Sequence, residues 1–228
     1  LDKAQKKGLV DFQATQIRNF SKDKHRRVDD TPYGGGEGML VRADVLFEAH
    51  QHALNQIKSQ VSLQIPGNEQ SQDSARAANI KTVLLSPQGK LFDQSMAKEF
   101  SQLDGLILVC GHYEGVDERF IELCVDEEIS IGDYVLTGGE LPALVLADVV
   151  TRLVPGVVGN EDSITQDSLE DGLLKYPQYT RPRDYEGLGI PEVLLGGNHQ
   201  EIARWRQLQR EERTRSKRPD LWAKRPQK

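Results

Sequence analysis

The sequence predicts an α/β fold with a parallel sheet, followed by a small helical domain at the C-terminus. Three segments indicate the sheet, because each places an apolar or β-branched run directly before a glycine-bearing loop: 82–90, 106–119 and 130–140. A polar stretch then separates them from a basic C-terminus with helical spacing. We expect an α/β domain over 1–158, a flexible linker over 159–172 and an all-helical domain over 173–228.

The middle segment, LILVCGHYEGVDER, gives the clearest indication of a buried strand. Its run Leu106–Val109 is apolar throughout and does not alternate, which is typical of a strand covered by helices on both faces. In the third segment the apolar run is Tyr134–Leu136, directly before Thr137 and two glycines. Apolar residues at helical spacing predict helices over 93–105, 116–128 and 141–156, and a longer one over 44–59 with Val45, Ala49 and Leu54 facing inward.

The three glycine-bearing loops are expected to form one ligand site. In open parallel sheets, the loops that leave the carboxyl ends of the strands line a common crevice. Two common nucleotide sites are excluded, because the sequence contains neither GxGxxG nor GxxxxGK[ST]. A zinc site on the 44–59 helix is not expected, since His50 and His52 are two residues apart and do not share a helix face.

The composition is that of a globular protein, with 228 residues of which 37% are hydrophobic. A run of about 18 apolar residues and a signal peptide are both absent, so we expect a cytoplasmic protein without a membrane partner. Cys110 and Cys124 lie in apolar surroundings and are expected to be reduced, buried thiols.

Charge is distributed unevenly along the chain. The net charge is −6, but residues 1–27 carry +5 and residues 204–228 carry +7, so the middle of the chain carries −18. Basic ends on an acidic body suit a protein that holds a polyanion with its ends. The candidate phosphate-binding residues are Lys22, Lys24, Arg26 and Arg27 in the first end, and Arg204, Arg206, Arg210 and Arg213 in the second.

Two further features adjoin these basic ends. Tyr33 and the three glycines after it suit a close approach to a ligand, and the polar stretch 64–79 is expected to be an exposed, mobile loop. In the C-terminal helix, Asn198 is the expected N-cap, and Ile202, Trp205 and Leu208 or Gln209 are spaced for a buried stripe.

Six motifs occur in an order that resembles the bacterial tRNA (guanine-N1)-methyltransferases of the SPOUT class. They are SPQG, LVCGHYEGVDER, SIGDYVLTGGELPA, RLVPGVVG, YTRP and GNH…IARWR, and the resemblance runs from about Gly8 to Leu221. The sequence departs from the family pattern in lacking a first strand before Leu1, in a longer loop at 64–79 and in shorter C-terminal helices. The resemblance implies a deep trefoil knot, a homodimer with shared active sites and S-adenosylmethionine as methyl donor. The implied substrate is the anticodon stem-loop of tRNA, methylated on the guanine immediately 3′ of the anticodon.

The resemblance also implies which residues form the site. Guanine N1 carries a proton at neutral pH, so the reaction needs a base and a cation near O6. These roles fall to Asp167 and Arg152, with Glu114 as a second carboxylate that holds the guanine edge or a Mg²⁺ ion. A base on a linker suits a loop that orders over bound RNA. The implied donor contacts are Leu85, Ser86, Pro87, Gly111, Tyr113, Glu114, Gly115, Ile131, Gly132, Asp133, Tyr134, Val135, Leu136, Gly138 and Gly139.

Three alternatives remain open at the level of sequence. A SPOUT-class ribose 2′-O-methyltransferase would share the knot and the donor, and a non-catalytic RNA-binding module would explain the basic ends. A Mg²⁺-dependent hydrolase would use the acids around the second and third loops, although helical spacing makes most of these a solvated face. Those acids are Glu114, Asp117, Glu118, Asp126, Glu127, Glu128 and Asp133.

Overall fold

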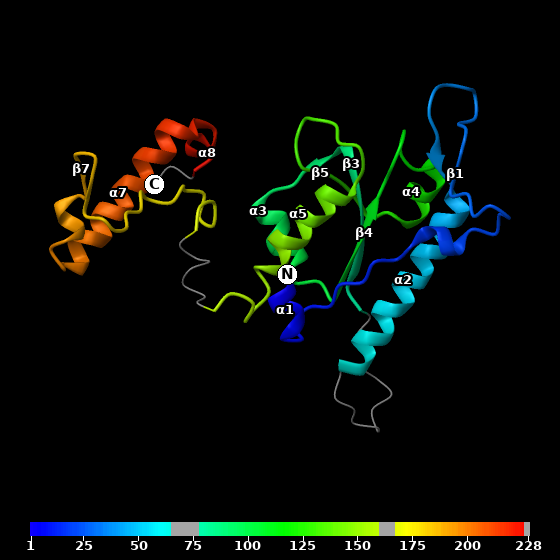
Figure 1. Cartoon of the computed structure of the whole chain (residues 1–228), viewed down its shortest axis with the longest axis horizontal. Coiled ribbons are helices and arrows are strands. Elements are labelled where there is room, and N and C mark those ends of the chain that lie inside the picture. Colours follow the sequence, from blue (N-terminus) through cyan, green and yellow to red (C-terminus); the bar gives the residue numbers. More distant parts are fainter. Residues whose placement is uncertain (65–77, 160–166, 226–228) are drawn as a thin grey trace. The chain divides into compact units, whose positions relative to one another are not determined.

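The computed structural model describes residues 1–64, 78–159 and 167–225, and the chain divides into two compact units, Leu1–Val157 and Val158–Lys228 (Figure 1). The first unit contains a three-stranded sheet with helices on both faces. The described residues of the second unit form two helices, a 3₁₀ turn and a short hairpin. Most of the loop predicted at 64–79 and the residues 160–166 of the predicted linker lie outside the described residues.

The sheet of the first unit is parallel, as predicted. It consists of β3 (Ile80–Leu91), β4 (Gly105–Cys110) and β5 (Glu127–Ser130), in the order β4-β3-β5. In the register of the sheet, Leu85 of β3 lies beside Cys110 of β4 and Ile129 of β5. The three chain segments that follow these residues therefore leave the sheet at the same edge.

Two hydrophobic cores lie on opposite faces of this sheet. Successive residues of β3 point to alternate faces, so Leu84 joins one core while Val83 and Leu85 join the other. Helices α2 (Ala43–Gln64) and α4 (Glu118–Cys124) cover the face of Leu84 (Figure 1). The opposite face is covered by α3 (Gln94–Phe100) and α5 (Glu140–Thr151). The expectation of strands covered on both faces is confirmed.

The third strand lies earlier in the chain than predicted. Strand β5 is Glu127–Ser130, whereas Tyr134–Leu136 belong to the loop that follows it. The acidic pair Glu127 and Glu128 was assigned to the solvated face of a helix, but that helix, α4, ends at Cys124. The carboxylate of Glu127 is accommodated in the sheet because Lys81 Nζ on β3 lies 2.5 Å from its Oε1.

The predicted helices differ from the observed ones mainly at their ends. Helix α3 ends at Phe100, and Gly105 is instead the first residue of β4, where a Cβ would lie 2.5 Å from Ile57 Cγ2. On α2, Val45 and Ala49 are buried as predicted, while Leu54 is half-buried.

The two histidines of α2 have separate environments. His50 Nε2 lies 2.9 Å from Thr82 Oγ1, and burial lowers the pKa of His50. The ring of His52 instead packs against Phe20, with 5.2 Å between the ring centres. The two rings therefore contact different parts of the first unit.

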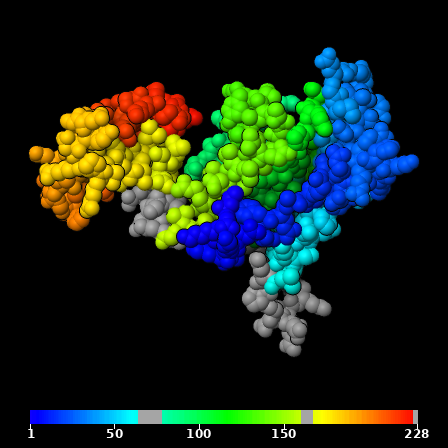
Figure 2. Space-filling model, viewed as in Figure 1, coloured from blue at the N-terminus to red at the C-terminus, as the bar shows by residue number. Residues whose placement is uncertain are grey.

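The amino-terminal part of the first unit is largely irregular. It contains α1 (Asp2–Lys6), a 3₁₀ turn η1 (Ile17–Phe20) and a short antiparallel pair of strands. These strands are β1 (Asp29–Asp30) and β2 (Leu40–Val41). The loop between them projects from the rest of the first unit (Figures 1 and 2).

The second unit centres on α7 (His199–Lys217), which α8 (Pro219–Ala223) follows directly. The Asn198 side chain accepts hydrogen bonds from the backbone N–H groups of Gln200 and Glu201, so the predicted N-cap is confirmed. The predicted stripe is only half-buried, and it includes Gln209 rather than Leu208, which is 57% exposed.

The prediction of an all-helical second unit is wrong. Besides the 3₁₀ turn η2 (Glu192–Leu194), it contains a short hairpin of β6 (Asp184–Tyr185) and β7 (Leu188–Gly189). The hairpin turns at Glu186 and Gly187, both of which have positive φ. Among the helices in the described ranges, none is both long and apolar enough to cross a membrane.

Candidate active site

The first predicted loop is a bulge within the long strand β3. Leu85 and Lys90 both lie beside Ile129 of β5, so the intervening Ser86–Gly89 bulge out of the ladder. Gly89 is required at the end of the bulge, because a Cβ there would lie 2.3 Å from the backbone carbon of Glu128. The Ser86 hydroxyl accepts a hydrogen bond from Gln88 N–H at 3.1 Å, which orders the bulge. The first loop is thereby held against β5.

The second and third loops contact each other through their backbones. Gly139 N–H donates to Gly111 O at 3.0 Å, and His112 pairs with Gly138 as an antiparallel bridge. A Cβ at Gly139 would lie 2.6 Å from the Cα of Cys110, so only glycine allows this approach. The structure thus brings the three predicted loops together at one edge of the sheet.

A side-chain pair also ties the second loop to the start of α5. His112 Nε2 lies 2.6 Å from Glu140 Oε1. Burial opposes ionisation of Glu140, but the hydrogen bond from His112 and the helix-start backbone N–H outweigh it, so the pKa of Glu140 is lowered. The adjacent Tyr113 has a φ of 59°, a conformation that non-glycine residues adopt only where the surroundings impose it. Sequence analysis did not single out His112, whose signal was its place within the HYEG motif.

The second loop is also fixed from its other side by the segment before β2. Val41 N–H donates to Gly115 O at 3.0 Å, and Glu114 N–H donates to Met39 O at 3.1 Å. The Glu114 side chain packs over Gly38, where a Cβ would lie 2.4 Å from its Cγ. The glycine-rich segment therefore determines where the Glu114 carboxylate lies, a contact that the sequence analysis did not predict.

An apolar groove of about 540 Å³ lies between the third loop and α5. Its α5 wall is unusually exposed for apolar side chains, with Leu141 at 62% and Leu144 at 56%. Exposed apolar residues that cluster in this way indicate a surface that another molecule covers. The lining residues are Ile131, Tyr134, Leu136, Leu141, Leu144, Val145, Asp148 and Val149.

The two predicted proton-transfer residues belong to different units. Arg152 caps the C-terminus of α5 in the first unit, where its backbone N–H donates to Asp148 O. Asp167 belongs to the second unit, and its Oδ1 accepts a hydrogen bond from Lys175 Nζ at 3.0 Å. Both side chains are half-buried.

The chain matches a known family along almost its whole length. A family model described as tRNA (Guanine-1)-methyltransferase TrmD matches residues 1–224. The chain belongs to this methyltransferase family. The resemblance of the six motifs is thereby confirmed, and the chain is an enzyme of this family rather than a non-catalytic RNA-binding module.

Curated relatives carry the same family name. The protein from Ruminiclostridium cellulolyticum is named tRNA (guanine-N(1)-)-methyltransferase and is 52% identical over 228 residues, which cover 100% of this chain and 90% of that protein. Proteins of the same name from Moorella thermoacetica and Clostridioides difficile are 50% and 45% identical over 224 residues. These cover 98% of this chain and 82% and 89% of the respective relatives.

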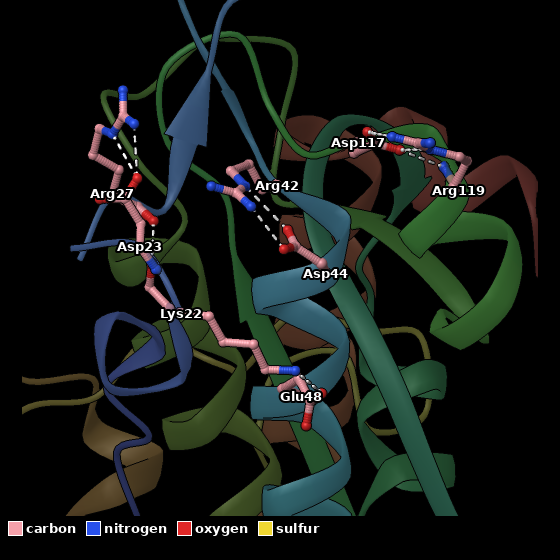
Figure 3. Close-up of polar contacts among 9 residues, drawn as sticks. Lys22, Asp23, Arg27, Arg42, Asp44, Glu48, Asp117 and Arg119 are labelled. Carbon is pink, nitrogen blue, oxygen red and sulfur yellow. Dashed lines mark hydrogen bonds and ion pairs between the residues drawn. The ribbon is translucent and has the colours of Figure 1, made fainter. Parts of the chain in front are cut away.

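The predicted phosphate-binding residues of the methyltransferase's first unit include two with acidic partners (Figure 3). Lys22 Nζ lies 3.2 Å from Glu48 Oε1, and Arg27 lies 2.7 Å from Asp23 Oδ2. The hydrogen bond and charge of Asp23 raise the pKa of Arg27, while Arg27 and the His25 backbone N–H lower that of Asp23 to about 2. These cations therefore have local partners with which an RNA phosphate would compete.

The four arginines predicted for the C-terminal helix do not form one face. Arg204 and Arg206 are exposed, and the Arg206 guanidinium lies 4.7 Å from the ring centre of Tyr176. Arg210 points inward, pairs with Asp171 and donates to Leu174 O. Arg213 lines a pocket together with Lys175 and Lys217. Spacing alone did not reveal that Arg210 anchors the preceding turn.

The acids that a Mg²⁺-dependent hydrolase would need are dispersed among other contacts. Asp117 pairs with Arg119 (Figure 3), Glu127 pairs with Lys81, and Asp126 accepts a hydrogen bond from Thr82 N–H. Within residues 1–64, 78–159 and 167–225, no group of three His, Cys, Asp or Glu side chains is placed to hold a metal ion.

Both cysteines are free and half-buried. Burial, together with the charge of Glu140, raises the pKa of the Cys110 thiol to about 11. Cys110 therefore stays protonated at neutral pH and is a poor nucleophile, although it lies at the end of β4 beside the loops.

The contact between the second and third loops predicts different outcomes for two neighbouring glycines. Gly139→Ala would press a Cβ onto the backbone of Cys110 and Gly111, at 2.6 and 3.0 Å, and should lower the free energy of unfolding by about 1–3 kcal/mol. Gly111→Ala is the matched control, since its Cβ would meet Val116 Cγ1 at an ordinary 3.7 Å. Urea unfolding measures both, and equal destabilisation of the two variants would contradict the contact.

Proposed function

We propose that the protein transfers a methyl group from S-adenosylmethionine to N1 of the guanine immediately 3′ of the anticodon in tRNA. The observation that carries this proposal is the junction of the three loops, held together by Gly139 N–H to Gly111 O and by the β3 bulge beside β5. It occurs in a chain of the tRNA (guanine-1)-methyltransferase family, whose name supplies the nucleobase and the type of RNA.

The loops suit an adenosyl donor in two respects. Their glycines allow backbone N–H and C=O groups to approach a ligand closely, and such groups can bind the adenine and ribose edges. The third loop adds apolar surface from Ile131, Tyr134 and Leu136 for the adenosine rings. When bound, S-adenosylmethionine supplies an electrophilic methyl group on a sulfonium. The residues proposed to hold it are those that the family motifs assigned to the three loops.

Proton transfer is assigned to Asp167 and Arg152. Guanine N1 becomes nucleophilic when its proton leaves, and the Asp167 carboxylate is proposed to accept that proton. Negative charge then develops on O6, where the Arg152 guanidinium stabilises it. Glu114, positioned by Gly38, is proposed to orient the guanine edge or to bind a Mg²⁺ ion. The remaining requirement is alignment of N1 with the methyl carbon and sulfur, which the fixed loops provide.

Binding of the anticodon stem-loop is assigned to exposed residues of both units. In the first unit, Lys24 and Arg26 are exposed, in addition to Lys22 and Arg27 with their acidic partners. Arg204 and Arg206 are exposed on α7. Tyr33, which is 99% exposed on the loop between β1 and β2, offers a ring on which an unstacked base can pack.

A trefoil knot and a homodimer are further parts of the proposal. The knot would thread the chain after the third loop through an earlier loop, and the close contact of Gly138 and Gly139 with Cys110 to His112 is consistent with such threading. The homodimer would cover the exposed apolar face of α5, formed by Leu141, Leu144 and Val145. Covering these side chains would remove apolar surface from water, which favours association.

Methylation of tRNA transcripts tests the reaction. Transcripts that differ only by guanine or adenine immediately 3′ of the anticodon are incubated with the enzyme and S-adenosylmethionine, and their nucleosides are analysed by mass spectrometry. We expect N1-methylguanine from the first transcript only.

Asp167→Asn should bind the donor normally but slow methylation by about 10²–10⁴-fold, because the base is lost. Asp220→Asn, which removes an acid paired with Arg218, is the control.

Two results would contradict this reaction. A 2′-O-methylated nucleoside would favour the ribose methyltransferase alternative. Full activity of Asp167→Asn, or loss of its donor affinity with normal turnover, would remove Asp167 from the role of base.

The dimer surface is tested by placing a charge on it. Leu144→Glu puts a carboxylate into the apolar face of α5 and should convert the dimer to a monomer, as measured by light scattering. Leu123→Glu makes the same change at a residue that is 75% exposed on α4, outside this face, and should leave the dimer intact. A monomeric wild-type protein at micromolar concentration would contradict the assignment.

A further inference from the structure

Backbone N–H groups of the turn that follows Asp167 hold this turn in place and join it to α7. Leu169 N–H donates to Leu173 O at 2.8 Å, and Leu174 N–H donates to the buried Thr214 hydroxyl at 2.9 Å. Lys175 N–H closes the turn by donating to Ser168 Oγ at 2.9 Å. The Leu173 side chain is 2% exposed, which anchors the turn further. These contacts hold the turn, and none of them uses the Lys175 side chain.

The Lys175 side chain has two neighbours, the Asp167 carboxylate and a pocket. On one side it donates to Asp167 Oδ1 at 3.0 Å, and both side chains are about a quarter exposed. On the other side Lys175 lines a pocket of about 390 Å³ together with Arg213 and Lys217. Ser168 and Gln178 add neutral hydrogen-bonding groups, and no carboxylate is among the lining residues in the described part of the chain.

We propose that this pocket binds one phosphate of the tRNA backbone, and that the bound phosphate draws Lys175 away from Asp167. The proposal rests on the proposed role of Asp167 as the base and adds a regulation of that role by the substrate. Three cations around one hollow match a phosphate, which offers several strong acceptor oxygens. Arg213 was already a candidate for phosphate binding, whereas Lys175 and Lys217 are additions from the structure.

The proposed exchange follows from the chemistry of the two partners. A hydrogen bond from an ammonium stabilises the ionised carboxylate, so Asp167 is a weaker acceptor for the guanine proton while Lys175 contacts it. A lysine carries three N–H donors on a flexible stem, so it can turn toward a new anion without moving the backbone. Since the pocket already contains two further cations, a phosphate there completes a stronger set of charged hydrogen bonds. Asp167 then loses the contact with Lys175, and becomes the stronger base, only when RNA is bound.

Salt dependence of RNA binding tests the pocket independently of catalysis. The probe is an anticodon stem-loop RNA, bound to the full-length protein in a KCl series. Lys175→Met and Lys217→Gln should each reduce the slope of log K against log salt by about one. Lys224→Gln removes an exposed cation outside the pocket and is the matched control. Lys175→Arg keeps the charge and should keep the slope.

Neutral phosphate analogues test the release of Asp167. Stem-loops carrying one methylphosphonate at each successive linkage are methylated under single-turnover conditions at saturating RNA. At one linkage the wild-type rate should fall by about tenfold, the equivalent of one lost charge-assisted contact, whereas Lys175→Met should show a ratio near one at that same linkage. A merely structural lysine would not give this difference.

Several outcomes would overturn the inference. Salt slopes of the pocket variants equal to that of the wild type would exclude phosphate binding in the pocket. A neutral linkage that slows Lys175→Met as much as the wild type would exclude the release of Asp167. If the wild type does not produce N1-methylguanine, the proposed function fails, while the salt slopes still decide whether the pocket binds phosphate.

Discussion

The close approach of Gly139 to Cys110 and Gly111 is the contact on which the rest of the candidate site depends. It joins the end of β4 to the start of α5, and the Gly89 bulge similarly joins β3 to β5. At both positions another chain segment occupies the space of a Cβ, so the loops cannot separate or shift without losing backbone hydrogen bonds. A site built from backbone groups requires this kind of rigidity, because no long side chain can adjust for a misplaced loop.

The second unit contributes a different physical property. Its turn after Asp167 is fixed to α7 through Thr214, Arg210 and the buried Leu173. The proposed base, Asp167, therefore directly precedes a fixed turn. It contacts Lys175, which also lines the cationic pocket. If the donor loops belong to one unit and the base to the other, catalysis can be made conditional on RNA that both units bind. This division of roles is a hypothesis that follows from the residues on each unit.

Sequence reasoning located the parts of the site that depend on local patterns. The apolar run Leu106–Val109 predicted β4, and the glycine-bearing segments predicted loops at one edge of a parallel sheet. It misplaced the third strand, because Glu127 and Glu128 are polar and the place of Glu127 in the sheet depends on Lys81 from β3. Long-range contacts of this kind have no signature in the spacing of residues.

Other features could be reached only through tertiary contacts or family resemblance. The packing of Glu114 over Gly38 joins residues far apart in the sequence. Arg210 reads as part of a basic helix face, but its contacts with Asp171 and Leu174 turn it inward. The assignment of Asp167 and the knot came from the ordered motifs, since an acid in a polar linker is ordinarily a surface residue.

The measurement that tests the central claim most directly is amide hydrogen exchange of the full-length protein with and without S-adenosylmethionine. If the three loops form one donor site, exchange should slow together in 86–89, 111–115 and 131–139 when the donor binds. Protection confined to one of these loops, or found only in the second unit, would contradict the account.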